Sequence, residues 1–296
     1  MRIAFIGLGE AASAFLSGWG PDVAGSVTAY DIKSASGATA QEIADRAAHL
    51  GIRNCATPDE ALADAQLVFS TVTADQAEIA AEAYALFLEA GAIWCDLNSC
   101  APETKRRAHR LIAAAGGVYL DVAVMSPVHP KLNMVPCLVS GARAEELAPT
   151  LAALPMDVRV VGDAVGRASS IKMVRSIMVK GLEALTAECT LAAVAAGVGG
   201  EVFPSLKSGA PHLDVPERAA YNFERSIVHG KRRAAEMDEV ARMLGDLGLP
   251  NDMALATSAW QQRLAKSGVE IPGGGTPPDH EWFARAILEV LGDAPD

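Results

Sequence analysis

The sequence has few cysteines, few basic residues and no long apolar segment. Its five cysteines form no C-x-x-C pair and are odd in number, which indicates neither a disulfide framework nor a zinc site. No run approaches the ~18 apolar residues of a membrane span, and the short apolar run after Arg2 lacks the cleavage pattern of a signal peptide. We therefore expect a cytoplasmic protein with reduced thiols and no membrane partner.

Basic residues are outnumbered, because 25 Lys and Arg stand against 36 Asp and Glu, for a formal net charge of −11. A nucleic-acid-binding surface needs a basic patch that releases counterions from phosphates. Only two short basic runs are present, 105–107 and 231–233, and we interpret the second, with His229, as a solvated helix face. The histidines lack a metal-binding spacing such as H-E-x-x-H. We expect no nucleic acid, no metal and a small molecule as the partner.

What the chain does have is the composition of a folded protein, since half of its 296 residues are apolar and 21% are charged. Its length favours two domains, at roughly 100–200 residues each. The first half alternates β-branched runs with amphipathic segments, which is typical of a parallel sheet covered by helices on both faces. The expected strands are 2–6, 26–30, 67–72, 93–96 and 118–123, with 137–140 and 158–161 as candidate edge strands; the expected helices are 10–18, 40–50, 75–90 and 102–115.

Two further patterns mark helices. Thr57 predicts a hydroxyl cap, Pro58 the first helical position and Glu60 the end of a capping box. From about Val165 the β-branched runs stop, and breaks at 197–200, 208–216 and 272–278 divide the rest into five or six expected helices. The first of these is predicted by apolar residues at three- and four-residue spacing: Ile171, Val174, Ile177, Met178, Leu182 and Leu185.

Residues 3–12 combine a strand, a glycine-rich turn and a helix start, which is the fingerprint of a dinucleotide-binding Rossmann domain. Gly7 permits the tight turn, Gly9 lets the backbone approach a pyrophosphate, and Ala12 lets the helix pack closely on the strand. Asp31, at the end of the second strand, can bind the adenosine ribose and would repel a 2′-phosphate, which favours NAD. NADP stays open, because Lys33 could pair with that phosphate.

The expected architecture is α/β: a doubly wound, mostly parallel sheet forms a Rossmann domain over 1–163, and an all-α domain for substrate binding and dimerisation follows over 164–296. Around 181–198 the helices are rich in alanine and apolar over much of their circumference, so we expect a homodimer or a higher homo-oligomer. The expected cofactor contacts are Gly7, Leu8, Gly9, Glu10, Ala11, Ala12, Asp31, Thr71, Val72, Thr73 and Asn98.

The segment Gly166-Arg167-Ala168-Ser169-Ser170-Ile171-Lys172, with the fingerprint and the change of pattern near residue 162, resembles the β-hydroxyacid dehydrogenase superfamily. That superfamily includes 3-hydroxyisobutyrate, tartronate-semialdehyde and 6-phosphogluconate dehydrogenases. In it, the lysine of a G-x-G-x-x-x-K-x-x-x-N motif is the catalytic acid/base. Lys172 falls on this lysine, Ser176 takes the place of the asparagine, and Ala168 that of the second glycine.

Two loops extend the resemblance. Residues 96–102 are similar to the family's D-x-S-T-x-x-P loop near the nicotinamide, and residues 121–127 to its substrate-binding D-A-P-V-S-G-G segment. The glycine pair of that segment is missing, because Met125 and Pro127 flank Ser126, which indicates a different substrate. Residues 165–193 and 232–239 are closest to a branch with a C-terminal domain of unknown function. The resemblance implies substrate contacts by Ser99, Ser126, Ser169, Arg175, Ser176 and Arg233.

The resemblance implies an NAD(P)-dependent oxidoreductase that transfers a hydride between the nicotinamide and a small, anionic β-hydroxyacid or its semialdehyde or keto form. Lys172 would exchange the hydroxyl proton, and Arg175 would favour its free amine. Cys100 is interpreted as packing. The alternatives are an imine or ketone reductase of related fold and a non-catalytic dinucleotide-binding protein. Lys172 argues against both, since imine-reducing relatives usually carry another residue there.

Overall fold

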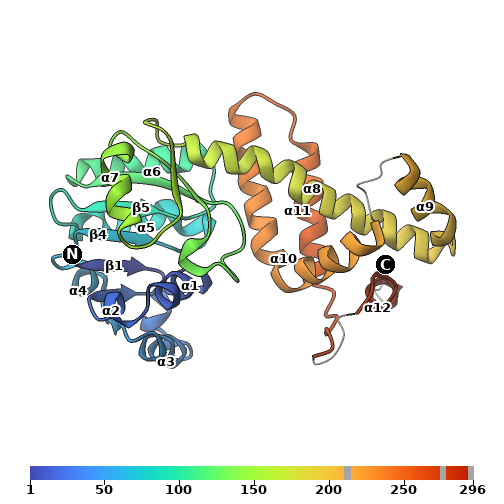
Figure 1. Ribbon diagram of the computed structural model, residues 1–296, viewed down its shortest axis with the longest axis horizontal. Coiled ribbons are helices and arrows are strands. Elements are labelled where there is room, and N and C mark those ends of the chain that lie inside the picture. The colour runs from blue at the N-terminus through green and yellow to red at the C-terminus, as the bar shows by residue number, and fades with distance from the viewer. Residues whose placement is uncertain (210–214, 274–277, 293–296) are drawn as a thin grey trace. The chain divides into compact units, whose positions relative to one another are not determined.

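The computed structural model describes residues 1–209, 215–273 and 278–292. The chain divides into two compact units, Met1–Met173 and Val174–Asp296, which we call the sheet unit and the helical unit (Figure 1). The long helix α8 (Arg167–Ala195) begins in the first and ends in the second. The expected division at residue 163 falls just before this helix, and we retain it as a proposal about function.

The sheet unit contains a sheet of eight described strands in the order β3-β2-β1-β4-β5-β6-β7-β8. Among these strands, only β6 and β7 pair in antiparallel fashion. The expected α/β fold is confirmed, and 158–161 lies at the edge of the sheet as expected, whereas 137–140 lies one strand inside it. The strands are β1 (Ile3–Ile6), β2 (Val27–Tyr30), β3 (Arg53–Asn54), β4 (Leu67–Ser70), β5 (Ile93–Asp96), β6 (Val118–Val124), β7 (Cys137–Ser140) and β8 (Val158–Gly162).

The register aligns the last residues of β1, β4 and β5 with the middle of β6. Ile6 of β1 pairs with Ser70 of β4, Ser70 with Asp96 of β5, and Asp96 with Asp121 of β6. Asp121 in turn lies opposite Ser140 of the antiparallel strand β7. Since the carboxyl ends of parallel strands are where α/β sheets bind ligands, this row of polar residues marks the functional edge of the sheet.

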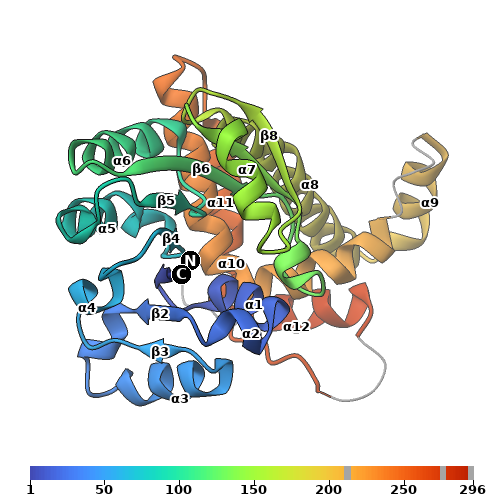
Figure 2. The same cartoon turned by 60° about the vertical axis from the view of Figure 1, so that its left-hand side comes forward.

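Helices cover both faces of the sheet (Figure 2). Alternate strand residues feed two apolar cores: Phe5 and Phe69 pack with Phe15 of α1 on one face, and Trp94 packs with Ile112 of α6 on the other. Burial on both faces explains why the strands are almost wholly apolar. The helices of this unit are α1 (Glu10–Trp19), α2 (Pro21–Ala24), α3 (Ala40–Leu50), α4 (Pro58–Leu62), α5 (Ala77–Tyr84), α6 (Pro102–Ala114) and α7 (Ala144–Ala152).

Several local expectations need correction. The helix expected over 75–90 is shorter, because 3-10 turns, η2 (Ala74–Gln76) and η3 (Ala85–Phe87), replace its ends. Helix α4 begins at Pro58 as expected, but the Thr57 side chain makes no capping bond, and Glu60 accepts the N–H of Ala56 at 3.3 Å instead. Helix α7 was missed, since Pro149 inside it weakens the helical pattern.

The helical unit consists, in its described part, of the rest of α8 together with α9 (Gly199–Gly209), α10 (Val215–Asp246), α11 (Asp252–Ala265) and α12 (His280–Gly292). Its apolar core joins Leu191 of α8, Phe223 of α10, Leu264 of α11 and Phe283 of α12. The expected all-helical region is confirmed. Over residues 1–209, 215–273 and 278–292, none of the helices is both long and apolar enough to cross a membrane.

Helix α8 has the predicted periodicity but an unexpected orientation. The apolar residues that predicted it are largely exposed, with Val174 at 56% and Met178 at 63% exposed. Its buried side instead carries Ser176, Lys180 and Glu183. Spacing therefore located the helix, whereas the face turned to the core depends on polar partners that the spacing does not reveal.

Candidate active site

The glycine-rich loop between β1 and α1 has the geometry of a dinucleotide cradle. Gly7 has a φ of +89°, and a Cβ there would lie 2.8 Å from the carbonyl oxygen of Thr71, so both its conformation and its surroundings require glycine. A Cβ on Gly9 would meet no described atom within 4 Å. No side chain of the described residues caps α1 at Gly9, so this helix N-terminus and the space beside it fit a pyrophosphate.

The loop is held by groups around it. The Asp31 carboxylate accepts the N–H groups of Leu8 at 2.8 Å and Lys33 at 2.9 Å. Arg46 of α3, which the sequence patterns did not single out, donates to the Leu8 carbonyl at 2.7 Å. The Thr71 hydroxyl donates to the Gly7 carbonyl at 2.7 Å. Two expected cofactor residues, Asp31 and Thr71, thus shape the loop directly.

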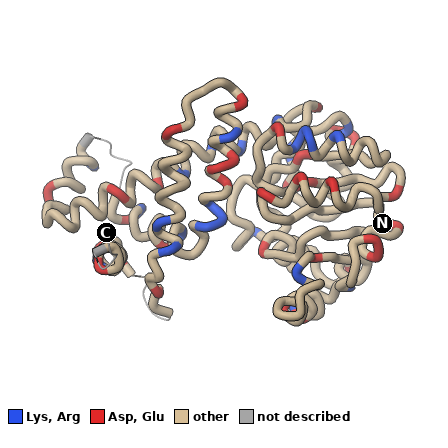
Figure 3. The backbone as a smooth tube through the Cα atoms, turned by 180° about the vertical axis from the view of Figure 1, so that it is seen from behind, with Lys and Arg blue, Asp and Glu red and all other residues tan. Residues whose placement is uncertain are grey.

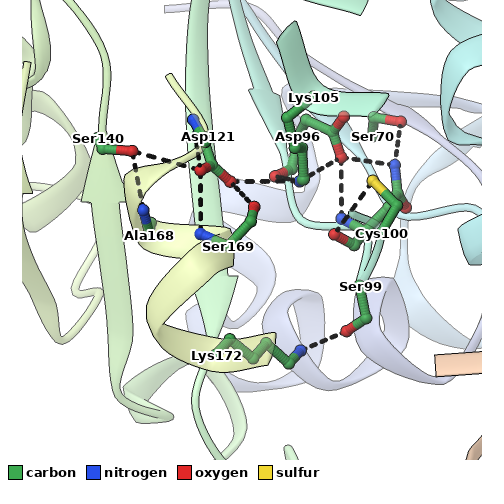
Figure 4. A network of polar contacts seen from close by, with 12 residues as sticks. Ser70, Asp96, Ser99, Cys100, Lys105, Asp121, Ser140, Ala168, Ser169 and Lys172 are labelled. Atoms are coloured by element: carbon green, nitrogen blue, oxygen red, sulfur yellow. Dashed lines mark hydrogen bonds and ion pairs between the residues drawn. The ribbon is translucent and has the colours of Figure 1, made fainter. Parts of the chain in front are cut away.

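A buried polar network lies at the end of β5 and the middle of β6 (Figure 4). Asp96 accepts hydrogen bonds from the Asn98 backbone at 2.9 Å, the Asn98 side chain at 2.7 Å and the Tyr119 hydroxyl at 2.6 Å. Asn98 also donates to the Ser70 hydroxyl at 3.0 Å. Its Oδ1 atom is buried and has no partner among the described residues, so an acceptor is available to a bound cofactor.

Asp121 accepts hydrogen bonds from the N-terminal turn of helix α8, as Asp96 does from the loop after β5. It accepts the backbone N–H groups of Gly166 at 3.1 Å and Ser169 at 3.0 Å, and the Ser169 hydroxyl at 2.5 Å. Ser140 donates to the same carboxylate at 3.3 Å and accepts the Ala168 N–H at 3.1 Å. A negative charge at a helix N-terminus is favourable, so Asp121 fixes where α8 begins.

Lys105 of α6 lies between the two aspartates and is completely buried. Its ammonium donates to the Asp96 carbonyl at 2.7 Å and the Asp96 carboxylate at 2.8 Å, and lies 3.5 Å from the Asp121 carboxylate. Burial opposes the ammonium form, but the neighbouring anionic groups, Asp96 first, raise the pKa of Lys105 above its ordinary value. The sequence placed Lys105 in an ordinary basic run, so its role was missed.

Lys172 lies on the second turn of α8, and its amine donates to the Ser99 hydroxyl (Figure 4). Its charge also reaches Cys137: burial raises the pKa of Cys137 to about 12, against the opposing effect of Lys172. The structure therefore brings together Lys172 and Ser99, two residues that the resemblance assigned to one site. Ser126 is half-buried and donates to the Pro127 carbonyl at 3.3 Å, and Cys100 is buried as expected.

The remaining expected substrate residues belong to the helical unit, whose long helices carry charges of both signs (Figure 3). Arg175 is exposed, whereas Ser176 is buried and accepts a hydrogen bond from Lys180 at 3.2 Å. Arg233 is also buried and pairs with Glu183. The interpretation of 231–233 as a solvated face is therefore wrong for Arg233, because Glu183 neutralises it inside the unit.

Comparison with known proteins agrees with this geometry. The model of the NAD binding domain of 6-phosphogluconate dehydrogenase matches residues 2–162, and that of a domain of unknown function (DUF1932) matches residues 193–264. A conserved hypothetical protein from Sinorhizobium meliloti is 35% identical, with 98% of this chain and 97% of that chain covered and a TM-score of 0.76. A conserved protein of unknown function, described as structurally similar to 3-hydroxyacid dehydrogenases, is 30% identical, with coverages of 89% and 96% and a TM-score of 0.66.

Two enzymes share the fold at lower identity. The 3-hydroxyisobutyrate dehydrogenase of Mycobacterium tuberculosis is 16% identical, with coverages of 98% of this chain and 99% of its own and a TM-score of 0.70. A reductive aminase from Aspergillus terreus is 18% identical, with coverages of 90% and 94% and a TM-score of 0.54. At such identities the likeness concerns the fold alone, so it does not choose between the two chemistries.

The fold and the loop thus define a nicotinamide-dinucleotide-binding Rossmann protein with a helical C-terminal region. Because the first model spans more than half of the chain, the chain belongs to the family of the NAD binding domain of 6-phosphogluconate dehydrogenase, and it carries a DUF1932 domain. The expected resemblance to 3-hydroxyisobutyrate and 6-phosphogluconate dehydrogenases is confirmed at the level of family and fold.

Proposed function

We propose that the protein is an NAD(P)-dependent dehydrogenase or reductase that acts on the CH–OH group of a small, anionic β-hydroxyacid. The observation that carries this proposal is the contact of Lys172 with Ser99 at the functional edge of the sheet. The bound nicotinamide supplies the hydride chemistry. Lys172 accepts the hydroxyl proton in oxidation and returns it to the carbonyl oxygen in reduction, while Ser99 holds its amine in place.

The other side chains have supporting roles. Ser126 and Ser176 carry hydroxyls that can bind substrate oxygens, and Arg175 adds positive charge for an anionic group. Ser169 differs from them, because its hydroxyl proton is committed to Asp121 and only its lone pairs remain for a ligand. Arg233 acts indirectly, since Glu183 already pairs with it.

NAD is the proposed cofactor, with NADP as the weaker ligand. One oxygen of Asp31 accepts the backbone N–H of Leu8 in the glycine-rich loop and the other that of Lys33, which keeps its negative charge where the adenosine ribose would lie. We also propose the cytoplasm as the setting, which is supported by five cysteines that form no disulfide.

The test is an absorbance screen for NADH formation against hydroxyacids and their phosphorylated or sulfonated analogues, with the Lys172→Met variant as the blank. The reverse direction is run with the keto forms, with and without an added amine. Turnover of a hydroxyacid supports the proposal. Turnover only with a ketone plus an amine would establish the reductive-amination alternative, the activity named for a neighbour of the same fold.

We propose further that the protein is a homodimer or a higher homo-oligomer. The support is the apolar face of α8, where Val174, Met178 and Leu185 are each more than half exposed, since such faces mark interaction surfaces. Light scattering should give at least twice the 30.8 kDa of one chain, and Met178→Glu should lower this mass. A matched control is Leu86→Glu in the sheet unit, where the side chain is 71% exposed against 63% for Met178. A monomeric wild-type protein would refute the assembly.

A further inference from the structure

Lys105 is a buried cation that contacts the supports of both halves of the candidate site. Its amine binds Asp96 at the end of β5 and lies 3.5 Å from Asp121 in the middle of β6. Those two aspartates are direct neighbours in the sheet register. Figure 4 shows the lysine between them, with the two supports extending to either side.

Each aspartate holds one arm of the site. Asp96 binds the backbone and the side chain of Asn98, the residue before Ser99. Asp121 binds the first turn of α8 through Ser169, which precedes Lys172 by one helical turn. The contact between Ser99 and Lys172 joins the far ends of these arms. Lys105 thus completes a ring of contacts that includes Ser99 and Lys172, the two groups proposed to meet the substrate.

Packing alone does not account for a charge at this position. Burying an ion costs free energy that a well-packed apolar side chain would avoid, and the same sheet edge is lined elsewhere by the neutral side chains of Ser70 and Ser140. Each carboxylate also has donors of its own, from Asn98 and Tyr119 on one side and from the start of α8 on the other. The ammonium adds the link between the two carboxylates.

We propose that Lys105 is a positioning residue that sets the placement of Ser99 against Lys172 by tying Asp96 to Asp121. The inference rests on the proposed function in that Ser99 and Lys172 are taken as the groups that meet the substrate. It requires that loss of the link loosens the contact at Lys172 while the dinucleotide loop, which Asp31 and Arg46 hold, stays as it is.

The test compares two charge-matched double variants of the full chain. Lys105→Met with Asp96→Asn removes one cation and one anion from the ring. Arg107→Met with Glu78→Gln removes a pair of opposite charges 2.8 Å apart and outside the ring, with Arg107 on the same helix as Lys105 and Glu78 on α5. Each protein is labelled briefly with a small acylating reagent, and the rate at Lys172 is read by mass spectrometry beside those of the exposed Lys33 and Lys131.

Lys172 should react about fivefold faster in the Lys105 variant, which corresponds to the loss of one ordinary hydrogen bond. Lys33 and Lys131 should be unaffected, and the Arg107 variant should match the wild type at all three positions. An unchanged rate at Lys172, or an equal rise at every lysine, would overturn the proposal, because the role would then be absent or merely structural. If the double variant Lys105→Met, Asp96→Asn does not fold, Lys105→Arg replaces it, since this substitution keeps the charge and alters the geometry. The same results at Lys172, Lys33 and Lys131 then support or overturn the proposal.

Binding of NAD is titrated on the same samples. If the wild-type protein does not bind NAD, the proposed function is wrong, while the labelling result still stands. A normal affinity with an unchanged Lys172 rate would sink the positioning role alone.

Discussion

The sheet unit gathers its buried charge around one lysine, whereas the helical unit spreads it along two long helices. In the sheet unit, Lys105 binds two carboxylates whose strands are neighbours in register. In the helical unit, Lys180 pairs with Glu236 at 3.0 Å, and Glu236 also binds Arg232 at 2.9 Å. Removal of Lys105 therefore takes the cation from both Asp96 and Asp121, whereas removal of Lys180 leaves Glu236 paired with Arg232.

The completeness of the two networks differs as well. In the helical unit, Arg233 pairs with Glu183, yet its Nε atom and the Oε1 atom of Gln261 are buried without partners among the described residues. In the sheet unit the Nε1 atoms of Trp19 and Trp94 are likewise buried without partners among the described residues, as is Asn98 Oδ1, which lies beside the proposed cofactor site. Polar groups at aligned strand ends are satisfied by the sheet itself, so an unsatisfied one there indicates a ligand.

The largest expected effect tests whether the chemistry lies in the sheet unit. Lys172→Met keeps the apolar stem and removes the amine, so kcat should fall at least about 100-fold, toward the upper range of about 10⁴ for acid–base catalysis. The dissociation constant of NAD should change little, because the glycine-rich loop is untouched. Steady-state kinetics with a verified substrate and a fluorescence titration measure both values. Retention of more than about a tenth of the turnover would move the proton transfer to another group.

The next prediction contrasts the two buried lysines. Lys105→Met leaves two buried carboxylates without their cation and should lower the free energy of unfolding by about 3–5 kcal/mol. Lys180→Met should lower it by only about 1–3 kcal/mol, since Arg232 still binds Glu236. Urea unfolding of the two variants measures the difference. Equal losses would mean that the two networks bury charge in the same way.

Alkaline pH should act on the sheet unit. Burial raises the pKa of Cys95, Cys137 and Tyr119 above the ordinary values of 9.0, 9.0 and 10.0. The folded state therefore holds these protons more tightly, so their stabilisation is complete below about pH 9 and is lost as the pH rises through the folded-state pKa values, at up to ~1.4 kcal/mol per pH unit and group. Urea unfolding at about pH 8 and pH 10 should show this loss, and Cys137→Ala should reduce it.

The smallest expected effect concerns the cofactor. NAD should bind about tenfold more tightly than NADP, because Asp31 faces the place of the 2′-phosphate. Fluorescence titration measures the dissociation constants of NAD and NADP, and Asp31→Ser should reduce the ratio between them. A tenfold preference for NADP would instead point to Lys33 as the phosphate ligand.

The two units also differ in how far the sequence predicts them. The ends of β1 and β5 could be placed because apolar runs stop at Ile6 and before Asp96, and the parallel register then brings those ends to one edge of the sheet. Ser99 was assigned to the site of Lys172 by the resemblance of residues 96–102 to the family's loop near the nicotinamide. Lys105 was not, because a lysine between Thr104 and Arg106 on an amphipathic helix resembles a solvated residue until the carboxylates opposite it are known.

The helical unit shows the reverse limit. Three- and four-residue spacing located α8, but Val174 and Met178 face outward while Lys180 and Glu183 face inward. A helix can turn either face to its neighbours, and the choice depends on ion pairs with α10, a helix whose pairing residues lie some 50 positions further along, as between Glu183 and Arg233. No local pattern records such a pairing.

The alignment of Asp96 with Asp121 also constrains how the gene can change. Side chains alternate between the two faces of a strand, so a one-residue insertion or deletion within β5 or β6 would turn one carboxylate to the opposite face and away from Lys105. Helix α6 and its flanking turns join the two strands and do not alternate between faces of the sheet. Beyond the residues from Pro102 to Lys105, their length can change without turning either carboxylate to the opposite face. Changes of length should therefore accumulate after Lys105 and be absent from the two strands.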